Sequence, residues 1–184
     1  MIWIVVIIAV VVLLVIIAIV MYNGLIRSRN QVENAWSQID VQLKRRVDLI
    51  PNLVETVKGY AAHEKETLDN VIRARNAAMS APSDPHAQAA ADNMMTGALR
   101  QLFALSEAYP DLKANQNFLA LQEELTATEG RVAYARQFYN DSVLSYNNKL
   151  QAFPTVIFAN MLKFTKREYF EADEASREVP KIGF

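Results

Sequence analysis

The chain has 184 residues, which is enough for one domain. Its 19 Lys and Arg nearly balance 20 Asp and Glu, and this argues against a nucleic-acid-binding protein, which would carry a basic surplus. With no Cys and only two His, disulfides and Cys nucleophiles are excluded and little material is left for a metal site. We therefore expect no cofactor, no metal and no nucleic-acid partner.

The first 26 residues contain no charged side chain and no His. The run from Ile2 to Tyr22 is almost wholly aliphatic, and about twenty such residues form a helix of about 30 Å, the thickness of a hydrocarbon core. A secretory signal would have a basic leader and a cleavage site, and a soluble core helix would have a polar face. We expect a transmembrane anchor over residues 1–26, with Ile2 to Tyr22 spanning the bilayer and Trp3 and Tyr22 near its two interfaces.

Basic residues follow the anchor directly at Arg27 and Arg29. Cytoplasmic flanks of membrane helices carry an excess of Lys and Arg. The N-terminus is therefore expected outside and residues 27–184 in the cytoplasm.

Beyond the anchor, apolar residues recur in steps of three and four as far as Ala61, which predicts a coiled-coil-like seam on one long helix. Residues of this seam repeat at intervals of seven: Trp36, Leu43, Ile50 and Val57. Pro51 lacks the N–H that would bond to the carbonyl of Val47. Because the apolar phase continues through Pro51, we expect a kink there and a helix that reaches about Gly59.

Two shorter helices are predicted next. One covers His63 to Ser80, and Asp84 and Pro85 form the start of another that reaches about Ala108. The side chains expected to face inward are Leu68, Ile72, Met79, Met94, Ala98, Leu102 and Leu105.

A fourth helix is predicted from about Lys113 to Ala152, roughly 60 Å long. Its seam repeats at intervals of seven through Phe118, Leu125, Val132, Tyr139 and Tyr146. No segment alternates with a period of two, so the expected class is all-α: a transmembrane helix continuous with an elongated antiparallel bundle of about four long helices. The expected domains are the anchor (1–26), a cytoplasmic bundle (27–165) and a C-terminal tail (166–184) that frays from Lys166.

Tests for catalytic motifs fail. His63-Glu64 is followed by Thr67 where the zinc-protease pattern H-E-x-x-H needs a second His. Neither His has a Glu three positions earlier, as a di-iron bundle requires, and no glycine-rich phosphate loop is present. We expect no enzymatic activity.

A candidate interaction surface is drawn from polar and aromatic residues close to the seams: Arg45, Arg46, Asn140, Tyr146, Phe153 and Phe158. The run Lys44-Arg45-Arg46 lies roughly 25 Å along a straight helix from Arg27, beyond the Debye length of ~8 Å. We therefore expect it to be solvated or to form salt bridges with a neighbouring helix rather than to bind lipid. The amides near the seams, Asn140 and Asn147 among them, are expected to be hydrogen-bonded and to specify packing first, and to bind partners second.

The apolar stretch from Phe153 to Phe164 is expected at the same end of the bundle as Arg27, because a long fourth helix returns the chain toward the membrane. Two roles stay open for it. It either caps the bundle or buries against a neighbouring subunit, or it contacts lipid with the help of Lys163, Lys166 and Arg167.

The stretch from Tyr22-Asn23-Gly24-Leu25 and Arg29 through Val54 resembles the LemA family. Shorter matches follow at Gly59–Glu64, Tyr109–Asn115, Arg136–Asp141, Tyr146-Asn147 and Phe153-Pro154. The resemblance covers nearly the whole chain. It implies an N-terminal anchor with a cytoplasmic antiparallel helical domain, no enzymatic activity and no catalytic residues to carry over, and some relatives are associated with membrane remodelling or envelope stress.

Two functions are compatible with these features. The first is a non-enzymatic, single-pass scaffold of the bacterial inner membrane, with the lipid bilayer, further copies of itself and unidentified proteins as partners. The alternative is a membrane-bound receptor or sensor that binds a ligand or peptide between its helices. A cavity of a few hundred Å³ with convergent polar groups would favour the second function.

Overall fold

The computed structural model describes residues 1–170, and these form six helices with no strand among them. The helices are α1 (Ile2–Lys58), α2 (Lys65–Ser80), α3 (Pro85–Ser106), α4 (Pro110–Lys113), α5 (Gln116–Gln151) and α6 (Thr155–Met161). The expected all-α fold with a long N-terminal helix is confirmed. The predicted tail falls mostly on residues 171–184, which lie outside the described residues.

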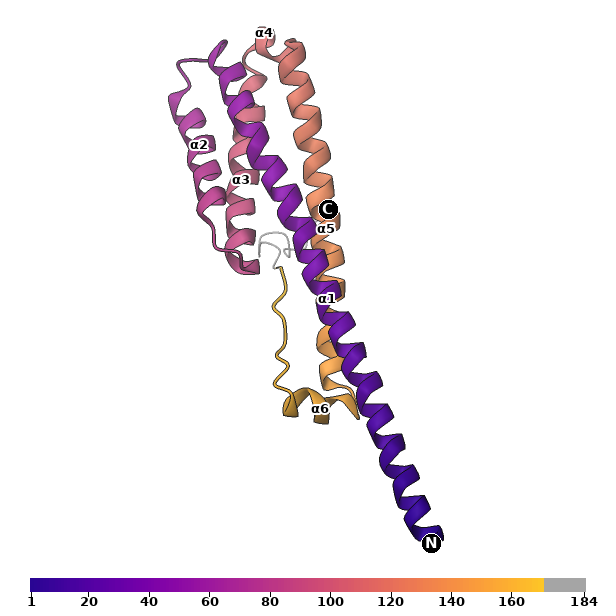
Figure 1. The fold of residues 1–184 in the computed structure, drawn as a ribbon. Coiled ribbons are helices and arrows are strands. Elements are labelled where there is room, and N and C mark those ends of the chain that lie inside the picture. The colour runs from indigo at the N-terminus through magenta and orange to yellow at the C-terminus, as the bar shows by residue number, and fades with distance from the viewer. Residues whose placement is uncertain (171–184) are drawn as a thin grey trace, which may run out of the picture. The chain divides into compact units, whose positions relative to one another are not determined.

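The chain divides into two compact units. The anchor unit consists of Met1–Ser37 and Gln137–Glu168, and the core unit consists, among the described residues, of Gln38–Arg136 with Tyr169 and Phe170. α1 and α5 each contribute one part to each unit (Figure 1).

α1 is one unbroken helix from Ile2 to Lys58. Among the described residues, α1 is the one helix that is long and apolar enough to cross a membrane. None of its most apolar 18-residue stretch is buried. Residues 22–30 are helical, as expected, so no flexible linker follows the apolar segment. Pro51 lies inside the helix and faces solvent, while its neighbours Ile50 and Leu53 are fully buried, which explains why packing carries the helix through the proline.

The hydrophobic core of the core unit combines α1, α2, α3, α4 and the first part of α5. α2 and α3 lie side by side and are joined by a short turn (Figure 1). The largest core side chains are Ile50, Leu53, Met95, Leu102, Leu112, Phe118 and Leu125.

Two of the predicted inward residues are wrong. Met79 is exposed because it lies in the last turn of α2, and Met94 is exposed because the buried face of α3 runs through Ala91, Met95 and Leu102 instead. The predicted Ala98 and Leu102 do lie on this buried face, so the error in α3 was confined to Met94, whose place is taken by Met95. α4 was also not predicted, although Pro110 stands at its first turn, where proline is well tolerated.

In the anchor unit, the seam of α5 is buried as predicted. Tyr139, Val143 and Tyr146 are among its buried residues, and Leu25 and Val32 are buried on α1. After α5 the chain turns into α6, which lies across the end of α5, and then runs back in an extended form toward Glu168 (Figure 1).

Candidate functional site

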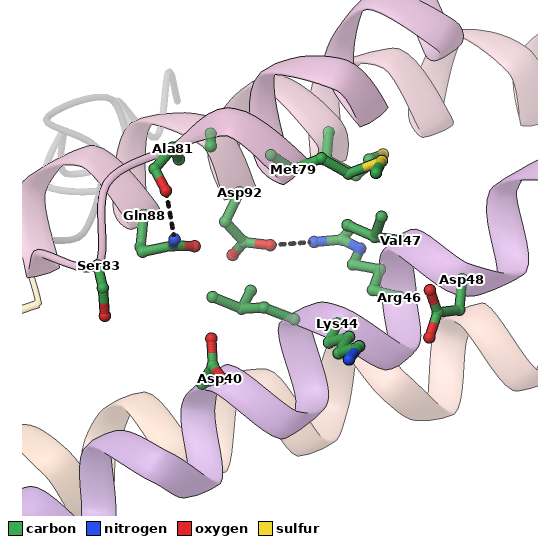
Figure 2. A pocket seen from close by; sticks show the side chains of 14 residues that line it. Asp40, Lys44, Arg46, Val47, Asp48, Met79, Ala81, Ser83, Gln88 and Asp92 are labelled. Atoms are coloured by element: carbon green, nitrogen blue, oxygen red, sulfur yellow. Dashed lines mark hydrogen bonds and ion pairs between the residues drawn. The ribbon is translucent and has the colours of Figure 1, made fainter.

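A cavity of about 350 Å³ lies in the core unit between α1, α2 and α3. α1 contributes the charged side chains Asp40, Lys44, Arg46 and Asp48, and α3 contributes Gln88 and Asp92 (Figure 2). The remaining lining residues are mostly small or apolar: Leu43, Val47, Ala78, Met79, Ala81, Ser83, Ala91 and Met95. A few polar groups on an apolar wall are typical of a small-molecule site.

The strongest polar contact of this cavity joins Arg46 to Asp92. The distance from Arg46 Nη1 to Asp92 Oδ1 is 2.6 Å, and both side chains are only 3% exposed (Figure 2). Arg46 Nε is buried without a hydrogen-bond acceptor among the described residues. A buried ion pair costs much desolvation, and removing one partner leaves an uncompensated charge.

Asp92 also faces a second cation. Arg136 Nη1 of α5 lies 3.7 Å from Asp92 Oδ2, and the guanidinium carbon of Arg136 lies 4.8 Å from the ring centroid of Phe170. The carboxylate of Asp92, on α3, therefore contacts arginines from both α1 and α5. Such a group ties three helices together, because both guanidinium groups approach the same carboxylate.

A second polar pair connects α1 to α5 in the core unit. Arg45 and Arg131 both approach Oε1 of Glu124, and all three side chains are at least partly exposed. The salt bridges expected for Arg45 and Arg46 are confirmed. The placement of Arg46 on an interaction surface is wrong, because its side chain is buried inside the bundle and paired with Asp92.

In the anchor unit, α5 holds an extended segment, which we call the return strand and define as Thr165–Glu168. Tyr146 donates to the Thr165 carbonyl (3.2 Å) and Tyr139 to the Glu168 carbonyl (2.9 Å). Between them, the amide of Asn147 donates to the Arg167 carbonyl and accepts from the Arg167 N–H, both at 2.9 Å. The expectation that the chain frays from Lys166 is therefore wrong for the described part, because side chains of α5 hydrogen-bond four backbone groups of the return strand, at Thr165, Arg167 and Glu168.

The return strand also reaches α1. Arg167 donates to Glu33 Oε1 at 3.1 Å, and Glu33 lies 3.7 Å from Arg29. Desolvation by burial raises the pKa of Tyr139 and of Tyr146 above the usual value of 10.0, against the opposing charge of Arg167. Both phenols therefore stay neutral and able to donate at physiological pH. The placement of Tyr146 on an interaction surface is wrong, because its side chain is only 1% exposed.

The end of α6 meets the end of the apolar segment of α1. The ring of Phe164 packs edge-on against Tyr22, with centroids 6.2 Å apart, and the guanidinium carbon of Arg29 lies 6.0 Å from the Phe164 centroid. The expectation that this stretch lies near Arg27 rather than near Gly59 is confirmed by these contacts.

Comparison with known proteins agrees with this architecture. The sequence profile of the LemA family matches residues 35–184. The chain belongs to the LemA family. The LemA protein of Metamycoplasma hominis is 30% identical over 158 residues, covering 84% of this chain and 71% of that protein.

Beyond this LemA protein, magnetosome proteins are more distant relatives. Magnetosome protein MamQ 2 of Paramagnetospirillum magneticum and MamQ of Magnetospirillum gryphiswaldense are each 22% identical over 179 residues, covering 84% of this chain and 66% of the relative. The chain thus spans about two thirds of the length of these magnetosome proteins. LemA membership and the candidate membrane helix indicate a membrane-associated protein of a family that is not a known enzyme family.

The other predicted surface residues of this LemA chain differ in accessibility. Phe153 is exposed, Asn140 and Phe158 are half-buried, and Arg45 is exposed but paired with Glu124. Among residues 1–170, no group of three or more His, Asp and Glu is placed to hold a metal ion.

Sequence reasoning missed Asp92. The available signal was its position three residues before Met95, on the apolar face of α3, where a carboxylate needs a buried partner. Recognising it required Met95 rather than Met94 to be placed on the buried face, since Asp92 lies one turn before Met95.

Proposed function

We propose that this protein is a membrane-anchored, non-enzymatic scaffold that self-associates and docks partners on the cytoplasmic side of the inner membrane. The observation that carries the proposal is the single helix α1, whose exposed apolar segment continues without a break into the packed part of the anchor unit. An anchor of this kind transmits the orientation of the bilayer to the residues beyond it. A role in envelope organisation, membrane remodelling or stress response fits such a scaffold.

Self-association through the cytoplasmic helices must use surfaces outside the seams. The seam residues of α1 and α5 are already buried within one chain. The large exposed apolar side chains of the core unit include Val41 on α1 and Tyr134 on α5. Exposed apolar groups of this kind favour contact with another protein when they gather on one surface.

Mass photometry of the full chain in lipid nanodiscs tests self-association directly. The expected result is particles larger than one copy, which shrink when Val41 and Tyr134 are both replaced by Ser. A matched control is Glu129→Ser, an exposed polar position on α5 that should leave the assembly unchanged. Uniformly monomeric particles in nanodiscs large enough for several copies would overturn the scaffold proposal.

Reporter fusions test orientation. A fluorescent protein that folds only in the cytoplasm, fused after Phe184, should be bright. A phosphatase active only outside the inner membrane should be inactive at the same position. The reverse pattern would invert the proposed topology.

A receptor or sensor is the second candidate function, and the cavity around Arg46 and Asp92 favours it. Its volume and its mixture of apolar walls with converging charged groups suit a small polar ligand. A thermal-shift screen of small metabolites against the full chain tests this function. A genuine ligand should lose its effect in Met79→Trp, which fills the mouth of the cavity from an exposed position, while Met94→Trp serves as the control outside it.

A further inference from the structure

α6 is placed beside the point where the apolar segment of α1 ends. Phe164 follows α6 by three residues and contacts Tyr22 and Arg29. Within the anchor unit, α6 lies across the direction of α1 (Figure 1). A helix that lies across a membrane-spanning helix at its end lies along the membrane surface.

One face of this region is apolar and uncovered. Phe153 is 82% exposed, Ile157 56% and Met161 67%. Ile157 and Met161 are four positions apart in α6 and share one face of it. Phe153, in the turn before α6, and Leu162, directly after its last residue, are exposed as well. The opposite side of α6 is anchored to the protein through the buried Ala159.

The charge around this face is positive. The side chains of the anchor unit include six Lys and Arg (Arg27, Arg29, Lys149, Lys163, Lys166 and Arg167) against three Asp and Glu (Glu33, Asp141 and Glu168). The whole chain has a net charge of −1, so the surplus is specific to this unit. Lys163 and Lys166 are exposed directly after the apolar face.

In the turn after α6, Lys163 occupies a position where glycine is the usual residue. Lys163 has a φ of 56°, and the N–H of Phe164 bonds to the carbonyl of Ala159 while the N–H of Lys163 bonds to that of Asn160. This is the Schellman arrangement, whose left-handed position is normally Gly. A lysine in a strained conformation fits a position where its charge is used.

We propose that the apolar face of α6, formed by Ile157 and Met161 of the helix together with Phe153 before it and Leu162 after it, is a second membrane contact that inserts into the headgroup region of an anionic leaflet. The inference rests on the proposed function, because it requires α1 to cross the same bilayer. Lipid is the occupant favoured over a second copy of the chain, since the face adjoins the end of the apolar segment and is flanked by cations. The contact would fix the anchor unit at two points and set its rotation about the membrane normal.

Single-cysteine labelling tests the proposal without background, because the native chain contains no Cys. Full-length Ile157→Cys and Met161→Cys carry an environment-sensitive fluorophore in nanodiscs of phosphatidylglycerol and phosphatidylethanolamine. Lipids with a nitroxide at a shallow acyl position should quench both labels strongly, and a deep nitroxide should quench them less. Aqueous iodide should quench them weakly.

Two control positions separate this proposal from the anchor itself. Val12→Cys, in the middle of the apolar segment, should be quenched most by the deep nitroxide, and Ser37→Cys, exposed on α1 beyond it, should be quenched only by iodide. If Val12 shows no lipid quenching, the anchor and the proposed function both fail. If Val12 is quenched by lipid while both α6 labels behave like Ser37, the second contact alone is overturned.

Two further results test whether protein covers the face instead of lipid and whether anionic headgroups contribute to the contact. Protection of both α6 labels from lipid and from iodide would mean that protein covers the face, and it would overturn lipid contact. Replacing phosphatidylglycerol by phosphatidylcholine, or combining Lys163→Gln with Lys166→Gln, should reduce shallow quenching several-fold. Unchanged quenching in both cases would overturn the role assigned to anionic headgroups.

Discussion

Asn147 pairs with the backbone of Arg167 as if it were a neighbouring strand: its side chain gives one hydrogen bond to the carbonyl and accepts one from the N–H, each 2.9 Å long. Through this pair a 36-residue helix, α5, holds an extended segment in place. The ion pair from Arg167 to Glu33 then ties that segment to α1. The return strand is therefore a bridge between two helices of the anchor unit.

Replacing Asn147 by Leu should release the return strand. Both backbone groups of Arg167 lose their partner, and the expected loss of stability is about 1–3 kcal/mol. Hydrogen exchange should become faster at the Arg167 amide. Asn148→Leu, the exposed neighbour, is the control and should leave this amide protected.

Removing only one partner of the ion pair between Arg46 and Asp92 should lower stability strongly, because the other charge stays buried without its partner. Arg46→Met leaves Asp92 with the more distant Arg136, and we expect a loss of about 3–5 kcal/mol. The double variant Arg46→Met with Asp92→Leu should be less destabilised than the sum of the two single variants, as denaturant melts of a double-mutant cycle can measure. Arg45→Met should change stability by no more than about 1 kcal/mol, because its partner Glu124 is partly exposed.

Stability should fall in alkaline solution. Burial raises the pKa of Tyr139 and Tyr146 above 10.0, so the folded chain keeps these protons where the unfolded chain releases them. Their contribution is complete below pH 10 and is lost as the pH rises through the raised pKa, at up to about 1.4 kcal/mol per pH unit for each phenol. Tyr146→Phe should lower the melting temperature at neutral pH and flatten its decline above pH 10. An equally steep decline would contradict the role of this phenol.

Lys163→Gly should separate stability from membrane binding. Glycine adopts the left-handed conformation without strain, so the free energy of unfolding should rise by about 0.5–1 kcal/mol. The same change removes a cation, so shallow-nitroxide quenching at Ile157 should decrease. Lys163→Asn tolerates the conformation but lacks the charge, and it should match Gly in the quenching measurement. If the label at Ile157 is quenched as strongly in both variants as with the native Lys163, this lysine has no electrostatic role.

Long-period patterns were readable because they persist through many turns. The seam of α5 predicted from Phe118 to Tyr146 is buried at every seventh position, and α1 ends within one residue of the expected Gly59. In α3 the pattern is short and rich in alanine, and Met94 and Met95 both have helical spacing to the buried Ala98. There the choice of Met94 over Met95 was wrong, and Asp92 was missed with it.

By itself, the sequence determined the all-α class, the apolar segment of α1, its continuation through Pro51 and the seam of α5, because helical periodicity and the absence of charge are local properties that repeat along the chain. Only the tertiary structure decided which polar residues are buried. Arg46 meets Asp92 across 46 positions, and Asn147 meets Arg167 across 20, and neither pairing leaves a periodic trace. The exposed face of α6 is likewise a tertiary result, since its residues are as apolar as those of the core and differ from them only in what the rest of the fold leaves uncovered.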